Sequence, residues 1–254
     1  MSLSILSVAS GIAAGNSGCG KGPAVLKNSS YWPKQLSTSW CPTIVPPEDK
    51  KTVLEKVQAM VIQLAHETSD LVKKQERFLV VGGDHSAAIG TWSGVKHALK
   101  DDFGLLWFDA HLDSHTHNTS ESGNIHGMPV AALLGQGVPE LTHIMDNQPA
   151  ILPQNLCIIG VHSFEAGEQK LIEDLNVRVY YMDEVNERGL STCVEEALKR
   201  IQQHTKVFGI SFDVDSIDPL EAPGVGTPEQ GGLHFKEFLP IIHQVSKKPK
   251  CIGF

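Results

Sequence analysis

The chain has 254 residues, of which 41% are hydrophobic and 20% charged, enough apolar material to form the core of one large or two small globular domains. Its formal net charge of -8 argues against a general binder of nucleic acid or membrane surfaces, because attraction to phosphate needs a basic face. Small polar or cationic ligands are favoured instead, and five cysteines without a CxxC pair indicate a reducing, cytoplasmic compartment.

Short apolar runs alternate with amphipathic stretches along the chain. In the first half of the chain, hydrophobic periodicity predicts a strand at 4–8, a proline-containing surface loop at 31–47, a helix at 48–74, a strand at 77–81, a helix at 87–100 and a strand at 103–108. In the second half it predicts strands at 155–159 and 177–181, a helix at 192–203, a strand at 207–212, a helix at 235–245 and a buried final strand within 250–254. The strand runs are almost continuously apolar, as in strands covered on both faces. The alternation predicts βαβ units, a parallel sheet and one α/β domain over 1–254.

Polar clusters follow four of the predicted strands. They read GGDHS at 82–86, DAHLD at 109–113, VHSFE at 161–165 and DVDSID at 213–218. In an open parallel sheet, ligands bind beyond the carboxyl ends of the strands, so we expect these clusters to meet in one crevice.

Two of the clusters, DAHLD and DVDSID, place acids, and in DAHLD also an imidazole, two residues apart, a spacing that points them to the same side of an extended chain. The candidate ligands are His85, Asp109, His111, Asp113, Asp213 and Asp215. Four carboxylates packed closely would repel one another unless cations neutralise them, and two divalent ions would do so. Imidazole with excess carboxylate and no cysteine suits Mn²⁺, and a water held between two such ions becomes a nucleophile, which predicts hydrolysis.

Each cluster taken singly has a structural alternative. An Asp after a strand is often a helix cap or a turn residue, and GGDHS could be a glycine turn capped by Asp84, with His85 a buried imidazole. Three strand-end clusters of the right ligand types are hard to obtain from capping alone. Together they favour a metal site.

The clusters also resemble a known family. GGDHS, DAHLD followed by SGNIHG, and SFDVDSIDP are similar to the signature segments of the arginase and agmatinase family, the manganese ureohydrolases, and GKGPAVL at 20–26 looks like another of their segments. The resemblance implies a three-layer αβα fold with a central, mostly parallel sheet of about eight strands. It also implies two Mn²⁺ ions per subunit and assembly into a homo-oligomer, a trimer or hexamer.

The resemblance assigns metal ligands position by position. It implies that His85, Asp109, Asp113 and Asp213 hold one ion and that His111, Asp109, Asp213 and Asp215 hold the other. A metal-bridging hydroxide would attack the guanidinium carbon of L-arginine, giving L-ornithine and urea. Asp113 would carry the proton to the departing amine, and His126 would act as proton shuttle, its alternative being an imidazole on a surface loop.

Substrate contacts follow from the same resemblance. Ser122 and Asn124 match the residues that read the α-carboxylate, which favours arginine, and Thr227 matches a Thr that assists the guanidinium-binding Glu of the family. Glu165 falls where the family places the acid facing the α-amino group. Glu168 is a possible second partner, although both acids could instead be solvated residues at a helix start, stabilised by the helix dipole.

Two departures from the family pattern bear on the substrate. His115 stands where arginases usually have Asn, so one carboxylate contact is replaced by a bulkier group whose charge depends on pH. The guanidinium-binding Glu of the family lies a few residues beyond the segment matched by KCIGF at 250–254, so we expect a longer native product or a poorly active chain.

Three other functions stay open. The same chemistry could act on another guanidino or formimino substrate, such as agmatine, guanidinobutyrate or formiminoglutamate. A non-catalytic relative could bind arginine or metal. A dimetal phosphoesterase is disfavoured, because no basic cluster or phosphate-binding glycine loop accompanies the ligands.

Overall fold

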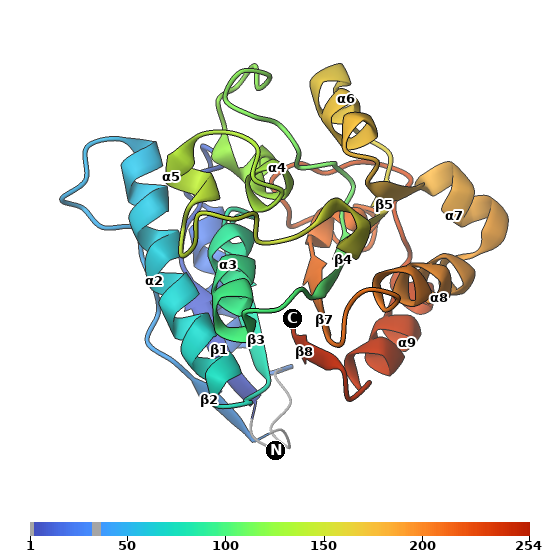
Figure 1. Ribbon diagram of the computed structural model, residues 1–254, viewed down its shortest axis with the longest axis horizontal. Helices are drawn as coiled ribbons and strands as arrows, with labels where there is room; N and C mark the ends of the chain where they lie inside the picture. Colours follow the sequence, from blue (N-terminus) through green and yellow to red (C-terminus); the bar gives the residue numbers. More distant parts are fainter. Residues whose placement is uncertain (1–2, 32–36) are drawn as a thin grey trace. The chain divides into compact units, whose positions relative to one another are not determined.

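The computed structural model describes residues 3–31 and 37–254. In it the chain forms parallel strands that are connected by helices (Figure 1). The eight strands described are β1 Leu3–Val8, β2 Thr38–Trp40, β3 Phe78–Gly82, β4 Gly104–Phe108, β5 Leu156–Val161, β6 Arg178–Tyr181, β7 Phe208–Phe212 and β8 Cys251–Gly253. The α-helices are α1 Gly22–Lys27, α2 Val53–Lys73, α3 Ala87–Leu99, α4 Pro129–Leu133, α5 Pro139–Thr142, α6 Ala166–Asp174, α7 Met182–Arg188, α8 Leu190–Ile201 and α9 Phe235–Ser246. Short 3₁₀ turns are η1 Cys19–Lys21, η2 Ile125–Gly127, η3 Pro153–Asn155 and η4 Val214–Ser216. The parallel strands and flanking helices confirm the predicted three-layer α/β class and its count of about eight strands.

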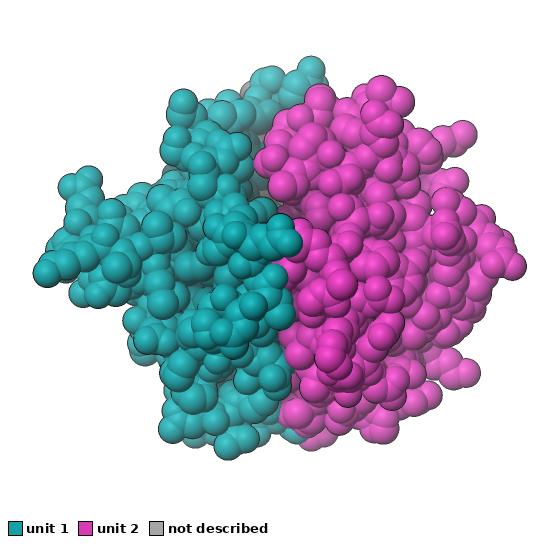
Figure 2. All heavy atoms as spheres, turned by 90° about the horizontal axis from the view of Figure 1, so that it is seen from above, with its two compact units in different colours: residues 1–101, 116–150 teal, residues 102–115, 151–254 magenta. Residues whose placement is uncertain are grey.

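The residues divide into two compact units, shown in teal and magenta in Figure 2. Unit 1 comprises Met1–Asp101 and Thr116–Ala150, and unit 2 comprises Asp102–His115 and Ile151–Phe254. Within the part of the chain that the structure describes, no helix combines the length and apolar character that crossing a bilayer requires.

Unit 1 contains three parallel strands in the order β2-β1-β3. The predicted helix at 48–74 begins later, at Val53, because Thr52 caps it. The Thr52 hydroxyl accepts the Glu55 N–H at 3.1 Å, and the Glu55 carboxylate accepts the Thr52 N–H at 2.9 Å. This reciprocal pair satisfies two N–H groups of the first turn that have no partner inside the helix.

Helices α2 and α3 pack side by side in unit 1 with almost no side chain between them at two places. A Cβ atom built on Gly90 would lie 2.4 Å from the Val61 carbonyl oxygen, and one built on Gly94 would lie 2.3 Å from the Ala65 carbonyl oxygen. Because these contacts are with helix backbone, rotation of a side chain could not relieve them. The glycines therefore set how closely the two helices approach.

Replacing Gly94 with alanine is expected to lower the free energy of unfolding by about 2 kcal/mol, because the overpacking penalty exceeds the gain in helix propensity. Urea denaturation followed by circular dichroism measures the change through the midpoint at constant m-value. Gly22→Ala in α1 is the matched control, because a Cβ atom there meets nothing within 4 Å. A Gly94→Ala protein as stable as the wild type would contradict the prediction.

Unit 2 contains five parallel strands in the order β8-β7-β4-β5-β6. Every second residue of three central strands enters one core with α7, α8 and α9; these are Leu106, Phe108, Cys157, Ile159, Phe208 and Ile210. The alternate residues Leu105, Trp107 and Ile158 are also fully buried. Both faces of these strands are therefore covered, as their continuous apolar runs predict.

The prediction of a loop at 31–47 is wrong in part. Thr38–Trp40 forms β2 and pairs in parallel with β1, while residues 32–36 lie outside the described part of the chain. A strand of three residues with a half-exposed pattern is too short to give a periodic signal. Helices α6 and α7 also lie in segments where no helix was predicted, for they have only nine and seven residues.

Candidate metal centre

The candidate ligands of unit 2 lie where two neighbouring strands end. Strand β4 runs into Asp109 and strand β7 runs into Asp213, and the two strands pair in parallel up to Phe108 and Phe212. The Asp213 N–H donates to the Phe108 carbonyl at 2.8 Å, so the pairing continues to the first ligand candidate. Residues distant in sequence are thereby brought to the same edge of the sheet.

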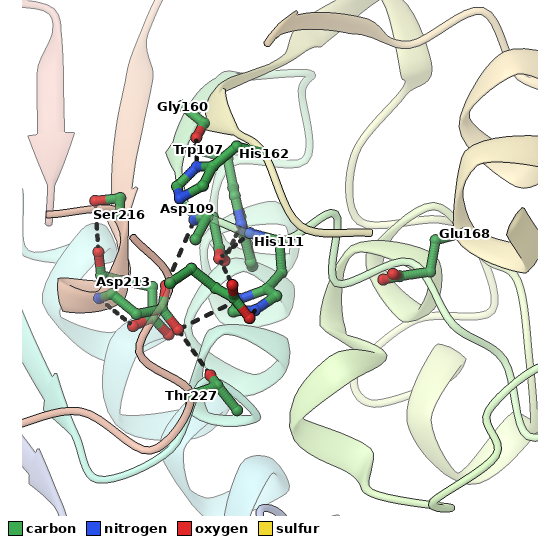
Figure 3. Close-up of polar contacts among 12 residues, drawn as sticks. Trp107, Asp109, His111, Gly160, His162, Glu168, Asp213, Ser216 and Thr227 are labelled. Carbon is green, nitrogen blue, oxygen red and sulfur yellow. Dashed lines mark hydrogen bonds and ion pairs between the residues drawn. The ribbon is translucent and has the colours of Figure 1, made fainter. Parts of the chain in front are cut away.

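Asp109 is held rigidly at the centre of this edge (Figure 3). Its side chain is 1% exposed, with Oδ2 accepting the Trp107 indole N–H at 2.9 Å and Oδ1 accepting the His111 backbone N–H at 2.8 Å. Because both donors are part of or next to β4, the strand itself determines the direction of the carboxylate.

His111 lies between Asp109 and Asp215. Its Nδ1 atom is 3.4 Å from Asp109 Oδ1 and 3.3 Å from Asp215 Oδ2. The three residues offer one ligand atom each, and these atoms all lie within 4.8 Å of one another. Two carboxylates and an imidazole at this spacing are a donor set for a divalent cation.

Asp213 and Asp215 are carried by the turn η4 that follows β7. Asp213 Oδ1 accepts the Asp215 N–H at 3.1 Å, so Asp213 does cap this turn, as one alternative proposed. Asp215 Oδ1 accepts the Ala110 N–H at 3.4 Å, and its Oδ2 accepts the Thr227 hydroxyl at 3.0 Å. Thr227 therefore contacts a ligand candidate from the loop that precedes α9.

The crowding of these acids changes their protonation. Burial, followed by repulsion from Asp213 and Asp109, raises the pKa of Asp215 to about 7, although the hydrogen bond from His111 opposes the change. Burial disfavours the charged form of His111, but its hydrogen bonds and charge interactions with Asp109 and Asp215 prevail and raise its pKa to about 12. Protons on His111 and Asp215 thus offset the negative charge of the clustered acids, and a divalent cation bound here would do the same.

Asp113 has an unusual backbone conformation at the end of the same segment. Its φ angle is 49°, in the left-handed region that residues other than glycine seldom adopt, and it is 6% exposed. The chain after β5 runs alongside this segment: His162 and Ser163 both donate their N–H groups to the Ala110 carbonyl, at 2.9 and 3.0 Å. Gly160, with φ of 102°, makes the bend that brings them there.

Three of the residues predicted to contact the substrate lie close together in unit 2. His115 Nε2 lies 3.1 Å from Glu165 Oε2 and 3.5 Å from Glu168 Oε2. Glu165 is the cap of α6, as the alternative for these acids proposed. Burial raises the pKa of Glu168, opposed by the charge of His115 and by hydrogen bonds from the Glu165 and Ser114 N–H groups.

The other predicted site residues belong to unit 1. His85 is half-buried in the turn after β3, where Asp84 Oδ1 accepts the Ser86 N–H at 3.1 Å, so the capping by Asp84 that the structural alternative describes is present. His126 lies in η2 and donates its backbone N–H to the Ala13 carbonyl at 3.2 Å. The Asn124 N–H donates to the Ser122 hydroxyl at 3.2 Å in the loop before η2. Each side chain therefore belongs to a loop or turn.

Sequence reasoning missed two residues near the ligands. The Trp107 indole holds Asp109, and the two-residue spacing along β4 was an available signal for that contact. Glu229 places Oε1 3.8 Å from His111 Nε2. Nothing local in the sequence indicated that contact, because the two residues are far apart along the chain.

Comparison with known proteins agrees with this geometry. The model of the arginase family matches residues 1–254. The chain belongs to the arginase family. The arginase of Bacillus caldovelox is 47% identical over 170 residues, which are 66% of this chain and 56% of that protein, and the arginase of Bacillus subtilis is 42% identical over 185 residues, which are 72% and 62%. The chain thus aligns with less than two thirds of the length of these arginases.

Solved arginases share the fold over a longer span. A crystal structure of arginase from Bacillus subtilis superposes with a TM-score of 0.93 and 31% identity, covering 100% of this chain and 89% of that one. The αβα architecture predicted from the family motifs is therefore that of arginases.

Proposed function

We propose that this chain is a manganese-dependent hydrolase that cleaves the guanidinium group of L-arginine to L-ornithine and urea. The observation that supports this most directly is the arrangement of Asp109, His111 and Asp215 around one point at the ends of β4 and β7, in a chain of the arginase family. Oxygen-rich ligand sets with imidazole suit Mn²⁺ and do not need thiolates.

Two Mn²⁺ ions are proposed to bind through six residues of this chain. Asp109 and Asp213 would serve both ions, with His85 and Asp113 completing one site and His111 and Asp215 the other. When bound, such ions supply a nucleophile from water near neutral pH. The hydrogen bonds from Trp107 to Asp109 and from Thr227 to Asp215 support the proposal, because partners of this kind orient metal ligands.

The remaining residues are proposed to move protons and to orient the substrate. Asp113 would carry a proton to the departing amine and His126 would exchange protons with solvent, both within the usual capacities of these groups. Ser122 and Asn124 would accommodate the α-carboxylate of arginine, and Glu165 would accommodate the α-amino group. Thr227 would assist binding of the guanidinium group through its hydrogen bond to Asp215.

A second substrate class is favoured by one contact. His115 Nε2 lies 3.1 Å from Glu165, so the acid assigned to the α-amino group already has a basic partner. A substrate without that amino group, such as guanidinobutyrate, would leave this pair undisturbed. The close runner-up is therefore the same reaction on a guanidino compound with a different distal end.

A substrate panel on the full-length protein tests the proposal. The protein would be loaded with Mn²⁺, its metal content determined, and the release of urea measured with L-arginine, agmatine and guanidinobutyrate, together with formamide release from formiminoglutamate. We expect about two Mn²⁺ ions per chain and the highest kcat/KM for L-arginine. Faster turnover of guanidinobutyrate would favour the runner-up, and arginine binding without turnover would favour a non-catalytic relative.

Assembly is proposed from the family resemblance, and location from the pattern of cysteines in the sequence. We propose a homo-oligomer, a trimer or hexamer, that works in the cytoplasm on a small guanidino substrate. Light scattering after gel filtration measures the oligomeric state directly, and a monomer at micromolar concentration would contradict it.

A further inference from the structure

Glu168 is a buried acid whose bonds connect two segments of unit 2. Its Oε1 accepts the Ser114 N–H at 3.1 Å, and its Oε2 accepts the Glu165 N–H at 3.1 Å. A third bond runs from the Ser114 hydroxyl to the Glu168 carbonyl at 3.3 Å. The start of α6 is thus tied to the segment that follows β4, 54 residues earlier in the chain.

The bond to the Ser114 N–H bears directly on Asp113. This N–H belongs to the peptide group that joins Asp113 to Ser114, and a peptide group is planar. Holding its N–H therefore restricts rotation about the Cα–C bond of Asp113. Asp113 has a φ angle of 49°, a conformation that non-glycine residues keep only when surrounding contacts impose it.

Exposure separates the roles of the two acids at α6. The Glu165 side chain is 60% exposed and so accessible to a substrate, whereas that of Glu168 is 6% exposed. Both carboxylate oxygens of Glu168 already accept backbone N–H groups. A group in this position is suited to hold backbone and poorly suited to bind a ligand from solvent.

We propose that Glu168 is a positioning residue for Asp113. Its carboxylate holds the peptide group after Asp113 and so keeps the Asp113 side chain in the position that a metal ligand and proton carrier requires. This inference rests on the proposed function and deepens it. Glu168 touches neither substrate nor metal in this role. Its effect passes through Ser114 to Asp113.

Glu168→Gln tests the inference, because glutamine keeps the shape but sets an NH₂ group against one of the two backbone N–H groups. Binding of Mn²⁺ to the full-length protein, measured by isothermal titration calorimetry, is expected to weaken about 10- to 100-fold for one of the two ions. The kcat should fall with both L-arginine and 5-guanidinopentanoate, which lacks the α-amino group, while KM stays near the wild-type value. A crystal structure of the variant should show Asp113 leaving its left-handed conformation.

Glu173→Gln is the matched control, because Glu173 lies exposed on the same helix and its carboxylate accepts the side-chain N–H of the neighbouring Gln169. It should leave Mn²⁺ affinity unchanged. If the Glu168→Gln protein fails to fold, Ser114→Ala provides the test: it removes only the hydroxyl bond to the Glu168 carbonyl and should weaken the same ion by a smaller factor.

Two results would overturn the inference. One is wild-type Mn²⁺ affinity in the folded Glu168→Gln or Ser114→Ala protein. The other is a rise in KM confined to L-arginine, which would make Glu168 a partner of the α-amino group. If the wild type itself binds no Mn²⁺, the proposed function fails together with the inference; if it binds Mn²⁺ and releases urea, these two results count against the inference alone.

Discussion

Replacing Asp109 with asparagine is expected to abolish stoichiometric Mn²⁺ binding and to lower urea release from L-arginine by about 1000-fold or more, since metal ions supply several kcal/mol of transition-state stabilisation. The proposed site needs this carboxylate for both ions. The amide would also place an NH₂ group against either the Trp107 indole N–H or the His111 backbone N–H, both of which now donate to Asp109. The side chain would then rotate away from the ligand position or lose a hydrogen bond.

Metal analysis after dialysis and a urea assay at saturating arginine measure this result. Asp183→Asn is the control, because Asp183 is an exposed acid in the first turn of α7. It makes the same change of charge and should behave as the wild type. Two Mn²⁺ ions and normal turnover in the Asp109→Asn protein would refute the role assigned to Asp109.

Mn²⁺ affinity is expected to rise steeply with pH. The pKa of Asp215 is raised to about 7 by burial and by the neighbouring acids, and that of His111 is raised further by its two carboxylate partners, so a cation must displace their protons in order to bind. Each proton displaced makes the apparent affinity increase about tenfold per pH unit below the pKa of the group. Between pH 5.5 and 7 we therefore expect an increase of at least about tenfold.

The free energy of unfolding of the metal-free protein should fall as the pH rises, whereas the Mn²⁺ affinity rises. A carboxyl group whose pKa is raised on folding, as that of Asp215 is, binds more protons in the folded than in the unfolded state. The contribution of Asp215 to the free energy of unfolding is present at acid pH. It is lost as the pH rises from about 4 to about 7, the interval between the ordinary and the folded-state pKa of this carboxyl group. Bound Mn²⁺ should remove this loss, since the cation replaces the proton.

Thermal melting with and without Mn²⁺ at pH 5.5, 6.5, 7.5 and 8.5 checks both expectations. The rise in Tm caused by Mn²⁺ should grow with pH. Calorimetry in two buffers of different ionisation enthalpy counts the protons released on binding. An affinity that is the same at pH 5.5 and 8.5, with no proton release, would show that the acids of this cluster do not bind the metal.

Much of the fold followed from local pattern. The continuous apolar runs of β4, β5 and β7 predicted strands covered on both faces, and each is buried as expected. The strand β2 and the short helices α6 and α7 were missed, because elements of three to nine residues leave little periodic signal. The start of α2 was misplaced by a few residues, although Thr52 and Glu55 carry a capping signature.

The ligand types of the candidate metal centre were also predicted from the sequence, while its contacts were not. Alternating acids and imidazole after an apolar run predict a ligand cluster, because residues two apart on an extended chain point the same way and parallel strands end at one edge. Which partner each side chain meets depends on residues far apart, as in the bond between Ala110 and Asp215, 105 residues apart. Only the tertiary structure joined His115 to Glu165 and Glu168 to Ser114, because the start of α6 meets the segment that follows β4, and no local rule predicts that contact.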